Sequence, residues 1–443
     1  MTAPRDGWRP GSGEAEAPGS RPAGVRVVMD LRPLQAPERA PLTAVYLEQL
    51  LTALDAEPRD GESFAFLLAL DLDDPTEGRW PSLEVVGRRL LPPTRLLRSG
   101  ALTVDPFLLR GASIGSGWHA ERGGASGSVY CAAAGALPIG SGIPIVASLL
   151  DLAPWQLPEA WQRGRAAKFG QRLRARLLRD AAAVIVPSRS AGVDARRLLH
   201  VRQAALRVVA LAPREAFRGS AGEGAAVERL ETERAAAERA AAERARLGLG
   251  ERYAVYEGRF DARHDLDTLL AALAALAAEG APAGVPADAW PPRIAVVGAS
   301  PDDRAEISRA AARAGVADAF VYAQALDDAR LAALVAGARF LVQPVRSDAA
   351  GTAAMDALAA GVPVVASAVG ALPEVVGPAG ILVEPADPRR LAAALRAAWS
   401  DDGLVAGLRA SAPERPAARR TWADVARETR AIWAEAARRA PML

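Results

Sequence analysis

The chain has 443 residues, of which 50% are hydrophobic and 24% are charged. This length exceeds the usual size of one domain, so we expect two or three domains with sizeable cores. A formal net charge of +2 calls for no nucleic-acid or membrane partner. The single cysteine, Cys131, excludes an intramolecular disulfide and a multi-cysteine metal site. A reducing compartment fits this composition.

Residues 1–24 are rich in Pro, Gly and Ser and contain no apolar core of a signal peptide. They are typical of a disordered tail and not of a secretion signal. No apolar run reaches the ~18 residues that a membrane-spanning helix needs. We therefore expect a soluble, cytoplasmic protein.

Residues 25–213 read as one α/β unit. Short β-branched runs predict buried strands, and residues 43–56 have the three- and four-residue apolar spacing of a helix. Strands that alternate with helices argue for a parallel sheet covered on both faces. The predicted strands are 25–31, 63–72, 142–152, 181–188 and 206–213.

Residues 214–250 form a charged insertion or linker. Within it, residues 227–248 repeat Glu-Arg-Ala-Ala-Ala and have almost no apolar stripe. Ala, Glu and Arg favour helix, so we expect a solvated helix that projects from the body. Helix 227–247 is a candidate for protein contact, although a lineage-specific insertion is the plainer interpretation.

A second strand–helix series occupies residues 251–410, and a final helix occupies 411–443 with Trp422, Val425, Thr429 and Trp433 on one face. We expect two doubly wound parallel-sheet halves, with the last helix packing across them. The predicted strands of the second half are 252–260, 293–300, 319–323, 339–344, 361–367 and 379–383.

The most informative residues follow two strands of the second half. Open α/β sheets bind ligands beyond the carboxyl ends of their strands. Arg259 falls there, and its planar fork suits a phosphate. Asp348 and Asp356 lie eight positions apart around Gly351 and Thr352. The glycine permits close approach of a ligand, the threonine can cap a helix, and a helix start favours a phosphate.

At these residues the chain resembles glycosyltransferase family 4, retaining enzymes of the GT-B fold. The family's Glu-x(7)-Glu motif corresponds to "PVRSDAAGTAAMDALAAGVPVV" in this chain, with Asp348-x(7)-Asp356 in place of the two glutamates. "GRFDARHDLDTLL" resembles the family's donor-phosphate segment, and "GALPEVVG" continues its usual run with Glu374. "LDLAPWQLPE", "AAAVIVPSRSA" and "RVVALAPREAF" resemble the end of its acceptor domain. The resemblance covers nearly all of residues 25–438 except the charged insertion.

The resemblance implies a role for each matching position. Asp348 would hydrogen-bond the sugar hydroxyls of the donor, and Asp356 would bind the ribose hydroxyls. Gly351 and Thr352 would bring backbone N–H groups to the β-phosphate.

Two further segments would complete the site. Arg259 and His264 would hold the diphosphate, with His264 where a lysine is usual. In the first half Asp151 follows Leu150, where the family has His-Asp, so Asp151 joins Asp348 as a candidate catalytic residue. A glycine-rich turn after the first strand is replaced by a segment that contains Pro41. The resemblance implies no metal and no cofactor beyond the nucleotide sugar.

Plainer interpretations stay open for each of these features. The two aspartates also suit a helix cap and a solvated helix carboxylate, Arg259 a surface ion pair, and Asp151 a turn before Pro154. The Asp-rich stretch 71–75 suits a turn better than a cation site. Helix 161–180, with seven basic residues, could touch an anionic membrane at its inner face or a phosphorylated acceptor, or simply be a solvated outer helix. Residues 111–128 read as a mobile loop near the cleft.

We therefore expect a GT-B hexosyltransferase that moves a sugar from a nucleotide diphosphate sugar to a hydroxyl acceptor in polysaccharide or glycoconjugate assembly. The alternative is a catalytically silent GT-B protein that binds a nucleotide sugar or acts as a scaffold. A phosphorylase of the pyridoxal type is disfavoured, because the only lysine, Lys168, lies outside the second half.

Overall fold

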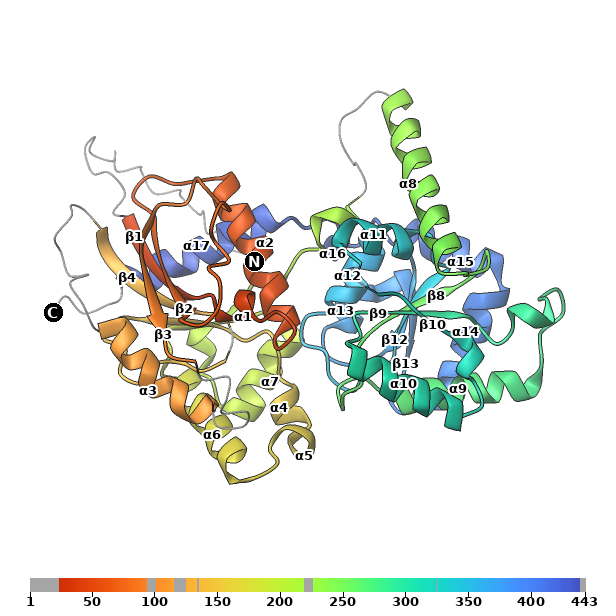
Figure 1. Cartoon of the computed structure of the whole chain (residues 1–443), viewed down its shortest axis with the longest axis horizontal. Coiled ribbons are helices and arrows are strands. Elements are labelled where there is room, and N and C mark those ends of the chain that lie inside the picture. The colour runs from red at the N-terminus through yellow and green to blue at the C-terminus, as the bar shows by residue number, and fades with distance from the viewer. Residues whose placement is uncertain are drawn as a thin grey trace, which may run out of the picture.

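The computed structural model describes residues 24–93, 101–114, 125–133, 135–218, 226–324 and 326–438. It contains two parallel sheets, each with helices on both faces, which lie side by side in Figure 1. The predicted architecture of two doubly wound halves is confirmed. The predicted tail 1–24 falls outside the described residues except for Gly24, at which the first strand begins.

The first sheet has the strand order β3-β2-β1-β4-β5-β6-β7, and every neighbouring pair is parallel. The order reverses between β1 and β4, which is the switch point of this half. The strands are β1 Gly24–Asp30, β2 Ser63–Ala69, β3 Val85–Leu91, β4 Ala125–Ala132, β5 Ile145–Ser148, β6 Ala183–Val186 and β7 Leu206–Val208.

Helices cover both faces of this sheet because their apolar stripes match the buried strands. α2 starts with Pro41 in its first turn, where a missing N–H costs nothing, and buries Leu47, Leu50 and Leu54. The helices are α1 Arg32–Gln35, α2 Pro41–Ala56, α3 Ala101–Ile114, α4 Ala153–Gln156, α5 Pro158–Trp161, α6 Arg165–Asp180 and α7 Arg189–Leu199.

Two strands of this half were not predicted. β3 is an edge strand whose side chains alternate between half-buried and exposed, including Arg88 and Arg89, so it lacks the apolar run of the others. β4 begins in a Gly/Ser-rich stretch and becomes apolar only from Val129. The predicted loop 111–128 is therefore wrong at both ends, which belong to α3 and β4, and its centre lies outside the described residues.

The second sheet has the order β10-β9-β8-β11-β12-β13 and is also parallel, and all six predicted strands are confirmed. Its strands are β8 Ala254–Glu257, β9 Ile294–Val297, β10 Phe320–Tyr322, β11 Phe340–Gln343, β12 Val364–Ser367 and β13 Gly380–Val383. Its helices are α9 Leu266–Glu279, α10 Pro301–Arg313, α11 Asp328–Ala336, α12 Thr352–Ala359, α13 Leu372–Val376, α14 Pro388–Ser400, α15 Asp402–Ser411 and α16 Pro416–Arg419.

The last helix, α17 (Trp422–Arg438), leaves the second half and packs on the first, as predicted (Figure 1). Trp433 meets Phe64 of β2 edge to face with ring centroids 6.5 Å apart, and Trp422 meets Tyr46 of α2 at 6.0 Å. The predicted face of apolar residues is thus the contact face. This crossing joins the two halves through a shared helix.

The charged insertion forms α8 (Ala226–Arg246), which projects from the second half in Figure 1. Arg234 and Glu238 are exposed and pair with each other, as expected for a solvated helix. The C-terminal end of α8 is not free, because Ala240 is buried and Glu243 accepts from Arg330 of α11 at 2.7 Å. Its role in protein contact stays a prediction.

The predicted basic helix 161–180 begins as α6 only at Arg165, after the separate turn of α5. Its outer face exposes Phe169 and five basic residues that make no ion pair with any described residue. These are Arg165, Lys168, Arg172, Arg176 and Arg179. Within the described ranges, no helix combines the length and apolar character that crossing a bilayer requires. Membrane contact through α6 stays a prediction.

Candidate functional site

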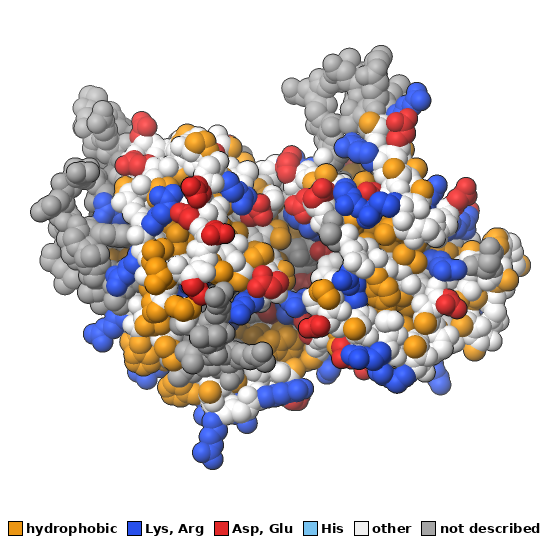
Figure 2. All heavy atoms as spheres, viewed as in Figure 1, with side chains coloured by type: hydrophobic (Ala, Val, Ile, Leu, Met, Phe, Trp, Pro, Cys, Tyr) orange, Lys and Arg blue, Asp and Glu red, His pale blue; other side chains and the backbone are white. Residues whose placement is uncertain are grey.

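The predicted site residues of the second half gather at the carboxyl edge of its sheet. β8 and β11 are neighbours at the point where the strand order reverses, so the loops that follow them lie together. A bridge between His264 and Val345 joins these two loops directly. Figure 2 shows acidic and basic side chains gathered where the two halves of the molecule meet.

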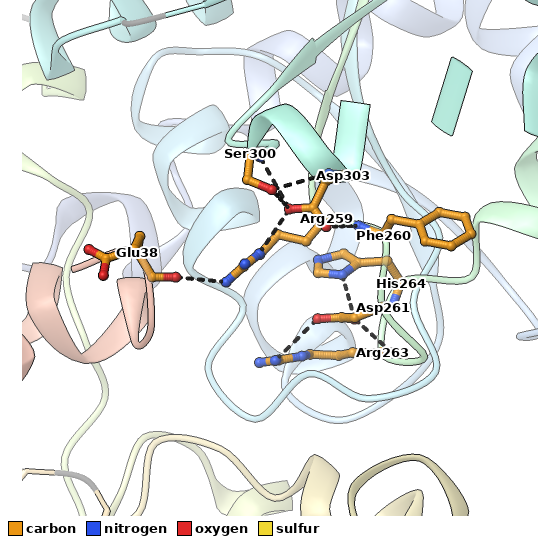
Figure 3. A network of polar contacts seen from close by, with 8 residues as sticks. All are labelled: Glu38, Arg259, Phe260, Asp261, Arg263, His264, Ser300 and Asp303. Carbon is orange, nitrogen blue, oxygen red and sulfur yellow. Dashed lines mark hydrogen bonds and ion pairs between the residues drawn. The ribbon is translucent and has the colours of Figure 1, made fainter. Parts of the chain in front are cut away.

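Arg259 lies just beyond β8, and its guanidinium reaches both halves (Figure 3). Its Nε donates to Asp303 at 3.2 Å, and its Nη1 donates to the backbone oxygen of Glu38 at 3.2 Å. Asp303 is fixed by Ser300 in a capping box at the start of α10, and also accepts the N–H of Phe260. Arg259 therefore stands at the domain junction, held in place by its ion pair with Asp303.

His264 lies deeper in the same loop. Its Nδ1 is 2.9 Å from Asp261 Oδ1, and its ring meets Tyr256 edge to face. Burial alone would raise the pKa of Asp261, but the hydrogen bond and charge of His264, with Arg263, lower it to about 2. The ionised carboxylate orients the imidazole, whose Nε2 makes no hydrogen bond to any described residue.

Arg263 was not predicted as a site residue, although it lies between Arg259 and His264. Its Nη1 donates to Asp151 Oδ2 of the first half at 3.2 Å. Its Nη2 is 3.4 Å from Asp261, a contact drawn in Figure 3. Its guanidinium also lies 5.6 Å from the Trp161 ring. The sequence did show a second arginine in this segment, but only the fold aims it across the domain junction.

The structure shows the turn expected of Asp151, whereas its catalytic role stays a prediction. Its Oδ1 accepts the N–H of Ala153 at 2.8 Å, which is turn chemistry at the start of α4. Its Oδ2 accepts a hydrogen bond from Nη1 of Arg263. Asp151 lies beyond β5, at the carboxyl edge of the first sheet. From there it reaches the loop after β8 of the second sheet, which we call the cation-bearing loop because it contains Arg259, Arg263 and His264.

The carboxylate of Asp348 accepts hydrogen bonds from the backbone of its own loop. Oδ1 accepts the N–H groups of Ala350 at 3.0 Å and Gly351 at 2.6 Å, and Oδ2 accepts Gln343 Nε2 at 2.6 Å. Burial raises the pKa of Asp348, and these backbone hydrogen bonds oppose the rise. The N–H of Gly351, expected to face a phosphate, is thus occupied by this carboxylate.

The predicted cap of α12 is wrong in one detail. Gly351 holds the N-cap position, and Thr352 is the first helical residue and makes no side-chain cap. Gly351 has φ +69°, a left-handed conformation in which a side chain would be strained. Gly370, at φ +55°, is required more strictly, because a Cβ there would lie 1.7 Å from the Asp348 carbonyl oxygen. This glycine lets the turn after β12 pack directly on the Asp348 loop.

Asp356 is buried, so the interpretation as a solvated helix carboxylate is wrong. Its two oxygens accept the backbone N–H of Arg214 at 2.8 Å and the Arg214 Nε at 2.7 Å. Burial raises the pKa of Asp356 to about 7, and the charge of Arg214 limits the rise. The carboxylate that was expected to bind ribose is therefore already hydrogen-bonded to Arg214.

Arg214 is a second residue of this site that was not predicted. It follows the last strand of the first half and gathers three carboxylates of the second half: Asp356, Glu257 at 3.4 Å and Asp328 at 3.0 Å. The signal available was its place in the segment "RVVALAPREAF", which resembles the family. Nothing in that segment shows which carboxylates an arginine will meet.

Further hydrogen bonds tie the two halves beside this site. Glu374 accepts the N–H groups of Arg189 at 3.1 Å and Ser190 at 2.7 Å, at the start of α7, where a helix dipole favours a carboxylate. The hydroxyl of Ser188 donates to the backbone oxygen of Ala349 at 2.8 Å. The carboxyl edges of the two sheets are therefore in direct contact through named bonds.

The second half is similar to known proteins. Residues 251–401 match the family model described as "Glycosyl transferases group 1". A curated MMP alpha-(1->4)-mannosyltransferase of Mycolicibacterium hassiacum is 36% identical over 128 residues, 28% of this chain and 31% of that protein. A D-inositol 3-phosphate glycosyltransferase of Xylanimonas cellulosilytica is 35% identical over 155 residues, 34% of this chain and 37% of that protein. The chain thus spans about a third of the length of these curated relatives.

Solved structures share the fold over most of the chain. A sucrose-phosphate synthase from Thermosynechococcus elongatus superposes with a TM-score of 0.65 at 21% identity, covering 93% of this chain and 98% of that one. Anabaena Alr3699/HepE in complex with UDP-glucose gives a TM-score of 0.60 at 16% identity, covering 93% and 98%. The fold is GT-B, as the resemblance implied. At these identities the likeness establishes the fold alone.

The Asp-rich stretch 71–75 behaves as a turn. Asp74 accepts the N–H and hydroxyl of Thr76 and pairs with Arg88 at 2.6 Å. Across the part of the chain that the structure describes, no group of three or more His, Cys, Asp or Glu side chains is placed to hold a metal ion.

Proposed function

We propose that the protein is a retaining glycosyltransferase that moves a hexose from a nucleotide diphosphate sugar to a hydroxyl acceptor in polysaccharide or glycoconjugate assembly. One observation carries the proposal. In a glycosyl transferases group 1 domain, the loop after β8 presents Arg259, Arg263 and His264 next to the start of α12. A cation-bearing loop beside a helix N-terminus is chemistry for a diphosphate.

In this proposal the departing nucleoside diphosphate gains negative charge in the transition state. Fixed donors aimed at that charge lower the barrier most when they are already in place. Arg259 is held by Asp303, and His264 is oriented by Asp261, so both are positioned before ligand arrives. Arg263 would exchange Asp151 for a phosphate oxygen. The exchange would free the Asp151 carboxylate in the cleft, where we propose that it acts on the acceptor.

The donor's sugar and ribose would meet the two aspartates of the motif. Asp348 would share its carboxylate with sugar hydroxyls, and its release from Gly351 would open that N–H to the β-phosphate. Asp356 already accepts Arg214, but each carboxylate oxygen can accept two hydrogen bonds, so ribose hydroxyls can bind beside the arginine. Retention of configuration and independence of metal are parts of the proposal that rest on the family resemblance.

Calorimetry and thermal shift against UDP, GDP, ADP and their common sugars test the proposal. We expect one nucleotide to bind the wild type. Its affinity for Arg259→Gln and for Asp356→Asn should be lower by about tenfold or more. Arg234→Gln, on the exposed part of α8, is the control and should bind normally. Binding accompanied by slow hydrolysis of the sugar supports the enzyme, whereas binding without hydrolysis or transfer leads to the silent nucleotide-sugar-binding alternative. No binding at millimolar ligand rejects the donor site.

A further inference from the structure

The first half contains a second buried charged cluster, at its own switch point. Asp30 ends β1, Arg32 begins α1, Asp105 lies on α3 and Tyr130 on β4. β1 and β4 are the strands between which the order of this sheet reverses, and ligands of open α/β sheets bind beyond such a point. The segment after α1 also carries the Glu38 carbonyl that receives Arg259, so the cluster lies next to the proposed donor site.

The cluster is built around one guanidinium. Arg32 Nε and Nη2 donate to the two oxygens of Asp30 at 2.9 and 2.7 Å, and Nη2 is 3.3 Å from Asp105 Oδ2. All three side chains are between 10% and 15% exposed. Among the described residues no other cation bonds to either carboxylate. Two carboxylates and one guanidinium leave a local formal charge of −1.

Three polar atoms of this cluster are left without partners in the described chain. Asp105 Oδ1 and the Tyr130 hydroxyl are buried with no hydrogen bond, and Arg32 Nη1 donates to no described residue. Burial raises the pKa of Tyr130 well above its usual range, and the charges of Asp30 and Asp105 add to that rise. Buried polar groups are nearly always hydrogen-bonded, so unpartnered ones at a ligand-binding edge indicate a site for a ligand.

The chemistry of the three atoms describes that ligand. A carboxylate oxygen accepts, a guanidinium nitrogen donates, and a tyrosine hydroxyl does both. Vicinal hydroxyl groups on a ring, each a donor and an acceptor, can satisfy all of them. A phosphate can only accept at neutral pH and would face the two carboxylates, which at close range disfavour a second anion. The cations that suit phosphate are on the other side of the junction, in the loop after β8.

We propose that Asp30, Arg32, Asp105 and Tyr130 form the acceptor subsite, and that it selects a neutral polyhydroxyl acceptor, a sugar or cyclitol ring, over its phosphorylated counterpart. This inference rests on the proposed function. It assigns the two ligands to opposite halves, with the anionic donor on the cation-bearing loop and the uncharged acceptor on the net-negative cluster.

The test compares matched acceptors with the nucleotide sugar found by the donor screen. Release of nucleoside diphosphate is followed with myo-inositol and glucose, and with inositol 1-phosphate and glucose 6-phosphate. We expect kcat/KM for the neutral member of each pair to exceed that of the phosphorylated member by about tenfold or more. In Asp105→Asn, which keeps the Arg32–Asp30 pair, we expect KM for the neutral acceptor to rise roughly tenfold and the preference over phosphate to shrink. Acceptor-independent hydrolysis and nucleotide affinity should stay within about twofold, which a general loss of structure would not allow.

Two further variants complete the design. Tyr130→Phe removes only the hydroxyl and should raise KM for the neutral acceptor severalfold without lowering the melting temperature, because the hydroxyl has no partner to lose. Glu48→Gln, which removes a carboxylate from a surface pair with Arg79 in the same half, is the control and should leave both KM values unchanged. A wild type that prefers phosphorylated acceptors, or a preference unchanged in Asp105→Asn, overturns the inference.

Failure of the proposed function would look different, because no nucleotide would bind and nothing would turn over. Acceptor binding is then measured without catalysis, by saturation-transfer NMR of myo-inositol and glucose with wild type and Asp105→Asn. Binding to wild type that weakens in the variant upholds the subsite. Equal binding to both proteins, or none to either, rejects it.

Discussion

Arg214 joins the two halves of the protein through Asp356. The arginine follows the last strand of the first sheet, and the aspartate lies on α12 of the second. Backbone N–H and Nε of the arginine reach separate oxygens of the aspartate at 2.8 and 2.7 Å, and Nη1 and Nη2 reach Asp328 and Glu257. One side chain thus holds the inter-domain segment against three carboxylates around the proposed ribose position.

Replacing Arg214 by methionine should destabilise the fold strongly. The substitution leaves the buried Asp356 without its cation, and breaking a buried pair from one side typically costs about 3–5 kcal/mol. Urea unfolding at pH 7.5 measures the loss. Asp328→Asn, whose carboxylate is 48% exposed, is the matched control and should cost under about 1 kcal/mol. Equal losses in the two variants would show that burial of the pair does not set its strength.

The pH dependence of stability should carry the signature of Asp356. Its pKa rises from 3.8 in the unfolded chain to about 7 in the fold, because the side chain is buried. The folded form therefore holds the proton more tightly, so this group's contribution is greatest below about pH 4 and is lost as the pH rises toward 7. Urea unfolding at several pH values should show a slope of this sign, and Asp356→Asn should lack it. A variant with the wild-type slope would assign the proton to another group.

Arg263 should contribute to nucleotide binding through the phosphates alone. Arg263→Gln keeps hydrogen-bonding capacity but removes the charge that faces Asp151 and Asp261. We expect the affinity for the nucleoside diphosphate to fall about tenfold while that for the nucleoside is unchanged, measured by calorimetry. The control is Arg293→Gln, at the opposite edge of the same sheet, where the arginine donates to the Asp318 carbonyl. Equal weakening of nucleoside and nucleotide would place Arg263 outside the phosphate site.

The crossing helix α17 should depend on one buried ion pair. Arg430 donates to Glu62 at 2.7 Å and to the Leu54 carbonyl at 3.2 Å, and its side chain is 3% exposed. Arg430→Met or Glu62→Gln alone should each cost roughly 3 kcal/mol or more, because each leaves a buried polar partner unpaired. The double variant should cost clearly less than the sum of the two, as urea unfolding of the four proteins would reveal. Additive losses would mean that the pair does not act as a unit.

Much of this architecture could be predicted from the sequence, because it depends on local patterns. Apolar runs and three- and four-residue spacing identified all six strands of the second sheet and the contact face of α17. β3 and β4 were not predicted, because neither has a continuous buried apolar run. β3 is an edge strand that contains Arg88 and Arg89, and β4 begins in Gly and Ser residues. The sequence also placed Arg259 and the segment from Asp348 to Asp356 beyond the carboxyl ends of predicted strands. It did not predict the strand order that makes β8 and β11 neighbours.

What those side chains bond to was decided only by the tertiary structure. Nearly all of the chain's 54 basic residues are arginines, and no local pattern says which of them will meet which of its 52 carboxylates. Arg214 reached Asp356 across 142 positions, and Arg263 reached Asp151 across 112, because two sheets bring their carboxyl edges together. Asp30, Arg32 and Asp105 became one cluster because the fold of the first half brings α3 to the carboxyl end of β1. Backbone periodicity is a property of neighbouring residues, whereas the choice of a charged partner depends on distance and burial, which exist only in the folded chain.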